Sequence, residues 1–313
     1  MPAMEAHILD SEHPSELVRE TVDRIRLVPE HARRYLEGRA EAARIHRIGP
    51  KFLGQLLAHG LPHRKTGADI LFDHLDLANV GLTFALRSPT RMAMRWWAKS
   101  LTKLAPGRET RYGLNLSGSC PTPGHPEDCR FSLHPRLRDL VRPGTIREDA
   151  PGSYSFDIRL HSDVHHFGAW FDPLIDHVRP LRFHLLPYPV NTDLGFLAET
   201  GLADCRMAAL HLHRAGTGLG VPMRVAAGYF VVPPYASVHV WPEVRDEDRW
   251  LPADPFLLQS LARWSIIDPA KWPPNRSPQG LLWRISDEYL ELIRHGDTTV
   301  YPVTRITSIA DHG

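Results

Sequence analysis

The 313-residue sequence has few cysteines and no long apolar run. Its three cysteines, Cys120, Cys129 and Cys205, are an odd number and a poor disulfide framework for so long a chain, which suits a reducing compartment. No stretch reaches the roughly 18 consecutive apolar residues of a membrane span, and the first residues do not pass from a basic to an apolar segment. We therefore expect a cytoplasmic protein without membrane spans.

An excess of charge of either sign is also missing. Lysine and arginine number 37 against 36 aspartate and glutamate residues, so no overall field would attract nucleic acid or a membrane surface. Small-molecule or protein partners are favoured instead. Apolar residues make up 42% of the chain, an ordinary value for a soluble globular protein with a substantial core.

The first part of the chain has helical periodicity. Val18 and Val22 lie at helical spacing after Ser15, which we expect to cap a helix. A second helical block is expected over about 68–104, with Leu71 on its apolar stripe. It ends in a cluster that we expect in the core: Met92, Met94, Trp96, Trp97 and Leu101.

Glycine and proline then interrupt the pattern from 105 to 151, which predicts a linker or a long loop. Short runs of β type follow at 154–156 and 181–186. We therefore predict an α+β protein in two parts. A helical N-terminal region over 1–150 would shape the substrate pocket, and 151–313 would form the catalytic core.

The residues with reactive side chains lie between 201 and 256. Asp204 is a good N-cap, so Cys205 would lie in the first turn of a helix, where the positive end of the helix dipole favours a thiolate. Backbone N–H groups at the helix start would also be available to an oxyanion. A lone cysteine in an apolar helix is more often a small core residue, so Cys205 needs partners to count as a nucleophile.

A histidine and an aspartate supply such partners. If 246–247 is the centre of a hairpin turn, His239 and Asp254 lie directly opposite each other on neighbouring strands. The carboxylate would then hold one imidazole nitrogen and fix its tautomer. Trp241 would share the face of His239 because side chains alternate along a strand. Strands are expected over three ranges: 223–232, 237–244 and 250–254.

Four motifs in this stretch have counterparts in a known family. They are Cys205 opening a helix, GVPMR at 220–224 before Gly228-Tyr229, HVWPEV at 239–244, and WLPADP at 250–255. The stretch resembles the core of the transglutaminase-like superfamily, where the patterns are a helix-opening cysteine, GIPAR-x-x-x-GY, HAW-x-EV and W-x-x-x-DP. Met223 and Val240 replace the usual alanines, and Ala203-Asp204 stands where glycine is common.

The resemblance implies a papain-like fold and a triad in which Cys205 is the nucleophile, His239 the general base and acid, and Asp254 the orienting carboxylate. It implies substrate-binding positions at Trp241 and Tyr229 and needs no cofactor. We hypothesise an acyltransferase that forms an amide bond on a small molecule through a Cys205 thioester in a biosynthetic pathway, with an acyl donor and an amine acceptor as partners. The alternatives are a cysteine peptidase or amidase, and a non-catalytic binding protein of the same fold.

Two further patterns have ordinary explanations. Cys120, His125 and Cys129 could contribute to a zinc site, but a structural site usually has four ligands, so we expect an ordered loop and no metal. Only distant histidines, such as His161, His165 and His166, could complete such a site. The run 130–147 contains five arginines and is expected as a solvated face, with an acyl carrier protein or an acidic substrate as alternative partners.

Overall fold

The computed structural model describes residues 13–67, 69–125, 128–142 and 144–309. Its contacts divide the chain into two compact units. Unit 1 contains the residues up to Trp96, Pro180–Ala208 and Ser260–Ile267. Unit 2 contains Trp97–Arg179, Ala209–Gln259 and the residues from Asp268 onward. The predicted α+β class is confirmed, since helices accompany mainly antiparallel sheets.

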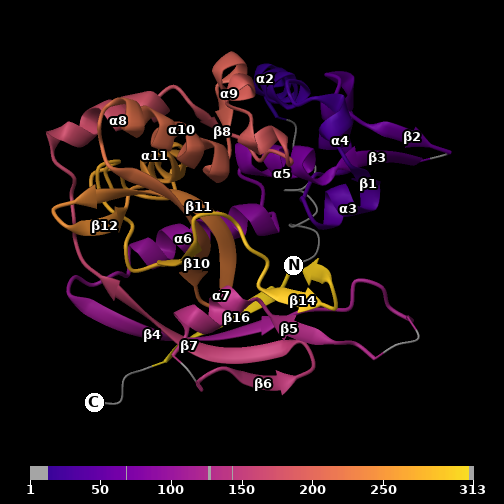
Figure 1. The fold of residues 1–313 in the computed structure, drawn as a ribbon. Helices are drawn as coiled ribbons and strands as arrows, with labels where there is room; N and C mark the ends of the chain where they lie inside the picture. Colours follow the sequence, from indigo (N-terminus) through magenta and orange to yellow (C-terminus); the bar gives the residue numbers. More distant parts are fainter. Residues whose placement is uncertain (1–12, 68, 126–127, 143, 310–313) are drawn as a thin grey trace. The chain divides into compact units, whose positions relative to one another are not determined.

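Unit 1 combines short helices with a small antiparallel sheet (Figure 1). Its helical elements are α2 (Ser15–Arg26), η1 (Glu30–Ala32), α3 (Arg39–Arg44), α4 (Pro50–Ala58), α5 (His74–Thr83), η3 (Val190–Thr192), α9 (Leu194–Thr200) and most of α6 (Pro89–Leu101). The sheet order is β1 (Tyr35–Glu37), β3 (Asp69–Asp73) and β2 (Arg64–Thr66), and β8 (Arg182–Phe183) pairs in parallel with β9 (Leu202–Ala203). The core of this unit includes Val18, Val22, Phe52 and Phe72.

Two expectations for this region need correction. The helix after Pro14 is confirmed, but Pro14 is the N-cap and Ser15 is the first helical residue, with no side-chain hydrogen bond at the cap. The helical block expected from residue 68 begins with a strand instead, because Ile70 and Phe72 alternate with more exposed neighbours. The helix starts only after Asp73, whose side chain accepts hydrogen bonds from the first N–H groups of α5.

Unit 2 is built on an eight-stranded antiparallel sheet (Figure 1). The strand order is β13 (Leu282–Ser286), β10 (Met223–Val232), β11 (Tyr235–Asp246), β16 (Val303–Ile309), β4 (Arg108–Ser117), β7 (Ser153–Ser162) and β6 (Arg147–Ala150), with β12 (Arg249–Pro252) on β11. A second sheet contains β15 (Thr298–Val300), β14 (Ile293–His295) and β5 (Phe131–Leu133). The remaining helical elements are α7 (Pro135–Leu140), η2 (Ala169–Phe171) and α8 (Asp172–Val178).

The linker or loop predicted over 105–151 is wrong. Residues Arg108–Ser117 form β4, which pairs along its whole length with β7 in the large sheet. The apolar residues of β4 are few but alternate, and Tyr112, Leu114 and Leu116 are buried in the core of unit 2. The helical region expected over 1–150 therefore gives way to sheet after Leu101, and the contacts divide the chain elsewhere than at residue 150.

Three helices are shared between the units. The division falls after Trp96 in α6, after Ala208 in α10 (Cys205–Gly218) and after Gln259 in α11 (Pro255–Arg263).

In α6 the expected core cluster is only partly buried: Met94, Trp97 and Leu101 are buried, whereas Met92 and Trp96 are more than a third exposed. Within the described ranges, the chain forms no helix with the length and apolarity that a membrane crossing requires.

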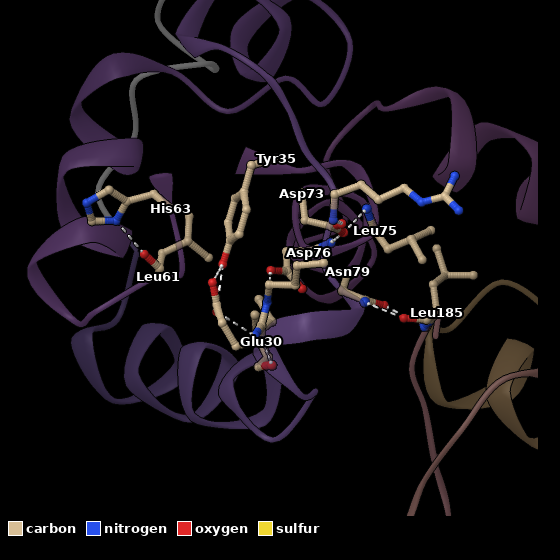
Figure 2. A network of polar contacts seen from close by, with 12 residues as sticks. Glu30, Tyr35, Leu61, His63, Asp73, Leu75, Asp76, Asn79 and Leu185 are labelled. Atoms are coloured by element: carbon tan, nitrogen blue, oxygen red, sulfur yellow. Dashed lines mark hydrogen bonds and ion pairs between the residues drawn. The ribbon is translucent and has the colours of Figure 1, made fainter. Parts of the chain in front are cut away.

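A buried ion pair ties the start of unit 1 to its central helix. Arg33 Nε donates to Asp76 Oδ2 on α5 at 2.8 Å, and Arg33 Nη2 donates to the carbonyl oxygen of Ile25 at 2.6 Å. Both charged side chains are only 3% exposed. Figure 2 shows Asp76 within a wider polar network, in which the Tyr35 hydroxyl donates to the carboxylate of Glu30. Burial raises the pKa of Asp76 to about 7 although Arg33 opposes this shift, so the carboxylate is ionised at pH 8.

We expect Asp76→Ala to lower the free energy of unfolding by about 3–5 kcal/mol at pH 8, because it leaves the Arg33 guanidinium buried without its partner. Urea denaturation of the full chain measures this change. Asp69→Ala is the matched control: Asp69 lies 3.9 Å from Arg39 with both side chains about 60% exposed, so its loss should cost less than about 1 kcal/mol. Equal losses in the two variants would contradict the expected role of the buried pair.

Candidate active site

Cys205 begins helix α10, as predicted. Asp204 is confirmed as the cap residue, since its Oδ1 accepts a hydrogen bond from the N–H of Met207 at 2.9 Å. Its Oδ2 accepts one from the side-chain amide of Asn191 at 3.1 Å. Burial raises the pKa of Asp204 to about 6, against the opposing effect of these two bonds. The half-buried Cys205 is a free thiol held at the start of a capped helix in unit 1.

His239 lies in the middle of strand β11, in unit 2. It is paired with Gly228 on β10, within a register that runs unbroken from Met223 to Val232. A side chain at position 228 would not fit, because a Cβ atom there would lie 2.0 Å from the carbonyl oxygen of Trp283 on β13. The close approach of three strands at this point keeps the backbone of His239 in a fixed position.

His239 and Asp254 form a buried hydrogen-bonded pair. Nε2 of His239 lies 2.7 Å from Oδ2 of Asp254, and the side chains are 1% and 5% exposed. The other carboxylate oxygen, Oδ1, accepts a hydrogen bond from the N–H of Leu257 at 3.0 Å, in the first turn of α11. Asp254 thus caps a helix and holds an imidazole at the same time, so its orientation is fixed from both sides.

The route by which the pair meets differs from the predicted one. The turn is centred on Glu247 and Asp248, because Asp246 pairs with Arg249, and the ladder of β12 ends at Pro252. Glu247 adopts a positive φ of 47°, which suits the first central residue of a tight hairpin turn. Asp254 follows Ala253, whose N–H donates to the carbonyl oxygen of Pro242. The predicted pairing of Asp254 directly opposite His239 is therefore wrong.

His239 and Asp254 still meet in this register, because diagonal neighbours on adjacent strands lie within reach of each other. By continuation of the observed register Asp254 would stand next to Trp241, and His239 is the diagonal neighbour on the same face. The chain leaves the strand at this point to start α11, and the carboxylate turns onto the imidazole. The predicted contact between His239 and Asp254 is therefore present even though the predicted pairing is not.

Aromatic rings surround the imidazole of His239. The ring of Trp241 is nearly parallel to it, with centroids 5.9 Å apart, and those of Trp97 and Phe230 approach edge-on at 5.6 and 5.8 Å. Charges attract more strongly in such apolar surroundings than in water, so an imidazolium formed here would be held firmly by Asp254. The sequence indicated Trp97 only as a core residue, and its contact with His239 was not predicted.

The hydrogen bond to Asp254 decides which nitrogen can act as a base. An ionised carboxylate can only accept a hydrogen bond, so Nε2 carries the hydrogen when the imidazole ring is neutral. The lone pair then resides on Nδ1, which becomes the atom that can remove a proton from a nucleophile and return it later. This is the arrangement that acyl transfer requires of its general base.

Comparison with known proteins does not add a family to this geometry. No protein-family model matches the chain, and no curated protein matches its sequence. The chemistry of the residues themselves must therefore decide between the possible functions.

The structure separates the two residues predicted at substrate-binding positions. Trp241 is fully buried on the face of His239, and among the described residues its indole Nε1 has no hydrogen-bond partner. Tyr229 pairs with Val238 and therefore points to the opposite face, where it stacks on Trp283 in the core of unit 2. The alternation of side chains along β10 explains this placement and removes Tyr229 from the surroundings of the imidazole.

A buried carboxylate on the same strand was missed by sequence reasoning. Glu243 lies two residues beyond Trp241 and its side chain is only 6% exposed. It accepts a hydrogen bond from Arg224 Nε at 2.7 Å, and Arg284 Nε lies 3.5 Å away. Both arginines compensate the buried negative charge of Glu243. The signal for Glu243 in the sequence was its place in the HVWPEV motif at 239–244.

Proposed function

We propose that this chain is a cysteine-dependent acyltransferase with a papain-like, transglutaminase-like catalytic core, in which Cys205, His239 and Asp254 form the triad. The observation that carries the proposal is the buried His239–Asp254 pair, with Nε2 committed to the carboxylate and Nδ1 left as the basic nitrogen. Cys205 lies in unit 1 and the His239–Asp254 pair in unit 2, and we propose that the three residues act together.

In the first step His239 Nδ1 takes the thiol proton of Cys205, and the sulfur attacks the acyl carbonyl of the donor. The carbonyl oxygen becomes an oxyanion, for which the N–H of Trp241 is a candidate donor. Collapse of this intermediate breaks the bond to the leaving group, which receives the proton from the imidazolium. The product is a thioester on Cys205, and Asp254 stabilises the imidazolium while it exists.

In the second step an amine attacks the thioester and His239 takes its proton. The carbon–sulfur bond breaks, the proton passes to the Cys205 thiolate, and an amide is released. Water can enter the same step and give a free acid, which is the peptidase or amidase alternative. Amide formation wins only if the enzyme holds the amine in attacking geometry, where well-placed groups reach effective molarities of about 10⁵ M or more.

We expect wild-type protein incubated with simple acyl thioesters to gain the mass of one acyl group, located on Cys205 by peptide mapping. Cys120 and Cys129 are also outside any disulfide, and their acylation in zinc-free protein is mapped alongside that of Cys205. Addition of a panel of primary amines should then release amide in preference to free acid. Intact-protein mass spectrometry follows the first step and chromatography of the small products follows the second.

The outcomes separate the three readings of the site. Free acid with every amine would support hydrolysis by the same triad instead of transfer. Acylation spread equally over the three cysteines, or none on Cys205, would support a binding protein without catalysis. A donor that reacts only when attached to a carrier protein would point to a protein-bound substrate, for which the run 130–147 supplies the basic residues.

A further inference from the structure

The structure gathers four potential metal ligands from two distant parts of the chain, all in unit 2. Cys120, His125 and Cys129 follow strand β4, and His295 ends strand β14. One ligand atom from each of these four side chains lies within 4.8 Å of those of the other three. From the sequence, a fourth ligand was expected only among distant histidines such as His161, His165 and His166; the structure places His295 there instead.

Backbone contacts fix His295 beside the two cysteines. Strand β14 pairs with β5, so that His295 stands opposite Phe131, two residues after Cys129. The N–H of Gly296 also donates to the carbonyl oxygen of Arg130 at 2.9 Å. The loop is anchored at its other end as well, because a Cβ atom on Gly118 would lie only 2.9 Å from Ile293 of β14. The four side chains are thus brought together by the fold itself.

The spacing of the ligand atoms suits a tetrahedral ion. Bonds of about 2.3 Å to sulfur and about 2.0 Å to nitrogen give a tetrahedron whose edges are about 3.3–3.8 Å. Cys129 Sγ lies 3.4 Å from His125 Nε2, within that range. The rings of His125 and His295 approach edge to face with centroids 5.2 Å apart. Within the described part of the chain, Nε2 of His295 is buried and has no hydrogen-bond partner.

We propose that Cys120, His125, Cys129 and His295 bind a zinc ion. Two thiolates and two imidazoles form a donor set that favours zinc over magnesium or calcium, which prefer oxygen ligands. Four protein ligands close the coordination shell, so the role is structural. Binding displaces the two thiol protons, so that zinc and two thiols give a dithiolate complex and two protons. The ion fastens the loop after β4 to the β14–β15 hairpin.

Metal analysis of the full chain tests this site. Wild-type protein, reconstituted with zinc and desalted, should retain one zinc ion per chain, and its cobalt form should show the intense visible absorption of tetrahedral cobalt with thiolate ligands. We expect His295→Ala to weaken zinc binding by about 10²-fold or more in competition with a chromophoric chelator, because one of four ligands is lost. Cys120→Ser should reduce the thiolate-to-cobalt charge-transfer band.

His161→Ala is the matched control, because it removes an exposed histidine of unit 2 that lies outside the four-residue cluster. It should bind zinc like the wild type. Retention of less than stoichiometric zinc by the wild type would overturn the proposal. Undiminished zinc affinity in His295→Ala, or a disulfide between Cys120 and Cys129 in protein purified under reducing conditions, would do so as well.

A second observation, in unit 1, concerns a cavity of about 270 Å³. Three arginines line it from separate elements, Arg24 of α2, Arg182 of β8 and Arg263 of α11. Burial lowers the pKa of Arg24; the charge of Glu20 opposes this shift and that of Arg182 adds to it. Burial also lowers the pKa of Arg263, and the charge of Arg182 lowers it further. Arg182 is therefore close enough to both Arg24 and Arg263 to repel them, and the described lining includes no carboxylate.

One residue that lines this cavity has a buried polar side-chain atom without a partner among the described residues. His184 is only 4% exposed, and among the described residues its Nε2 has no hydrogen-bond partner. Its backbone is fixed, since its N–H donates to the carbonyl oxygen of Ala203 at 2.8 Å. Burial, reinforced by Arg24 and Arg33, lowers the pKa of His184 to about 3, so the neutral ring can offer one N–H. Thr21 and Ser260 add hydroxyl groups to the lining.

We propose that this cavity binds a small anion with phosphate or carboxylate groups. Planar guanidinium groups donate pairs of hydrogen bonds to such oxygens, and a bound anion would relieve the repulsion among the three arginines. Calorimetry on the full chain with pyrophosphate and with citrate tests the two sources of this chemistry. We expect binding of at least one of them, weakened about 10-fold or more in Arg182→Gln.

Arg19→Gln is the control, because Arg19 lies on the same helix as Arg24 but its side chain is 59% exposed and does not line the cavity. Its affinity should equal that of the wild type. The proposal is overturned if neither anion binds the wild type at millimolar concentration, or if Arg182→Gln and Arg19→Gln bind equally well. His184→Gln should weaken binding as well, since an amide cannot reproduce the position of the imidazole N–H.

Discussion

Cys205→Ala should reduce acyl transfer to the background rate, a loss on the order of 10⁵-fold or more, because the proposed covalent intermediate forms on the Cys205 sulfur. The intact mass of the variant should not change on incubation with acyl thioesters. The reaction is followed by single-turnover chromatography with the donor and amine that work best on the wild type. Alanine is a good residue for the first turn of a helix, so α10 should be retained.

Cys205→Ser adds a stricter comparison. Serine has nearly the same shape and can form an ester, but its hydroxyl is a much weaker nucleophile than a thiolate without strong activation. We expect it to be nearly as inactive as the alanine variant, with a folded circular dichroism spectrum. Transfer that continues at the wild-type rate in either variant would exclude the mechanism, whatever the site geometry.

Asp254→Asn should lower the rate of acyl transfer by about 10³–10⁴-fold while the protein stays folded. The asparagine carbonyl can still accept the N–H of Leu257 and cap α11, which leaves its amide facing His239. An amide donates, so Nε2 of His239 would become the acceptor and the proton would move to Nδ1. The imidazole would then be unable to take the proton of Cys205.

Asp246→Asn provides a closely matched comparison. Asp246 lies on the same strand as His239 and also holds a histidine, with His165 Nε2 2.8 Å from its Oδ2. It has no place in the proposed triad, so its rate should stay within about twofold of the wild type. Equal losses in the two variants would show that Asp254 matters for stability alone, which thermal unfolding of both would reveal.

Local features of the site could be predicted from the sequence. Cys205 at a helix start, the cap at Asp204 and the strand that bears His239 follow from short-range patterns that depend on a few neighbouring residues. The contact of His239 with Asp254 was also predicted, but from a register that is wrong by one position in the turn. It survived because the diagonal neighbour on a strand is also within reach.

Long-range features could not be predicted in this way. The apolar residues of β4 are spaced by polar ones in a segment rich in glycine and proline, so the local pattern predicts a loop and hides the alternation of the strand. Its partners β7 and β16 are separated from it along the chain, and only their pairing makes the strand evident. His295 has the same difficulty, since nothing near it in sequence indicates that β14 lies beside Cys129.

The alternation of the two units along the chain has a consequence for how the protein is made. Unit 1 includes Ser260–Ile267, where Trp264 packs against Phe183 and its carbonyl oxygen accepts a hydrogen bond from Arg91. A ribosome synthesises the chain from the N-terminus, and domains usually fold as they emerge. Here unit 1 is incomplete until Ile267 has been synthesised, and unit 2 also needs residues from Asp268 onward. A nascent chain that stops before Ser260 would therefore leave both units unfinished, whatever the length of its N-terminal part.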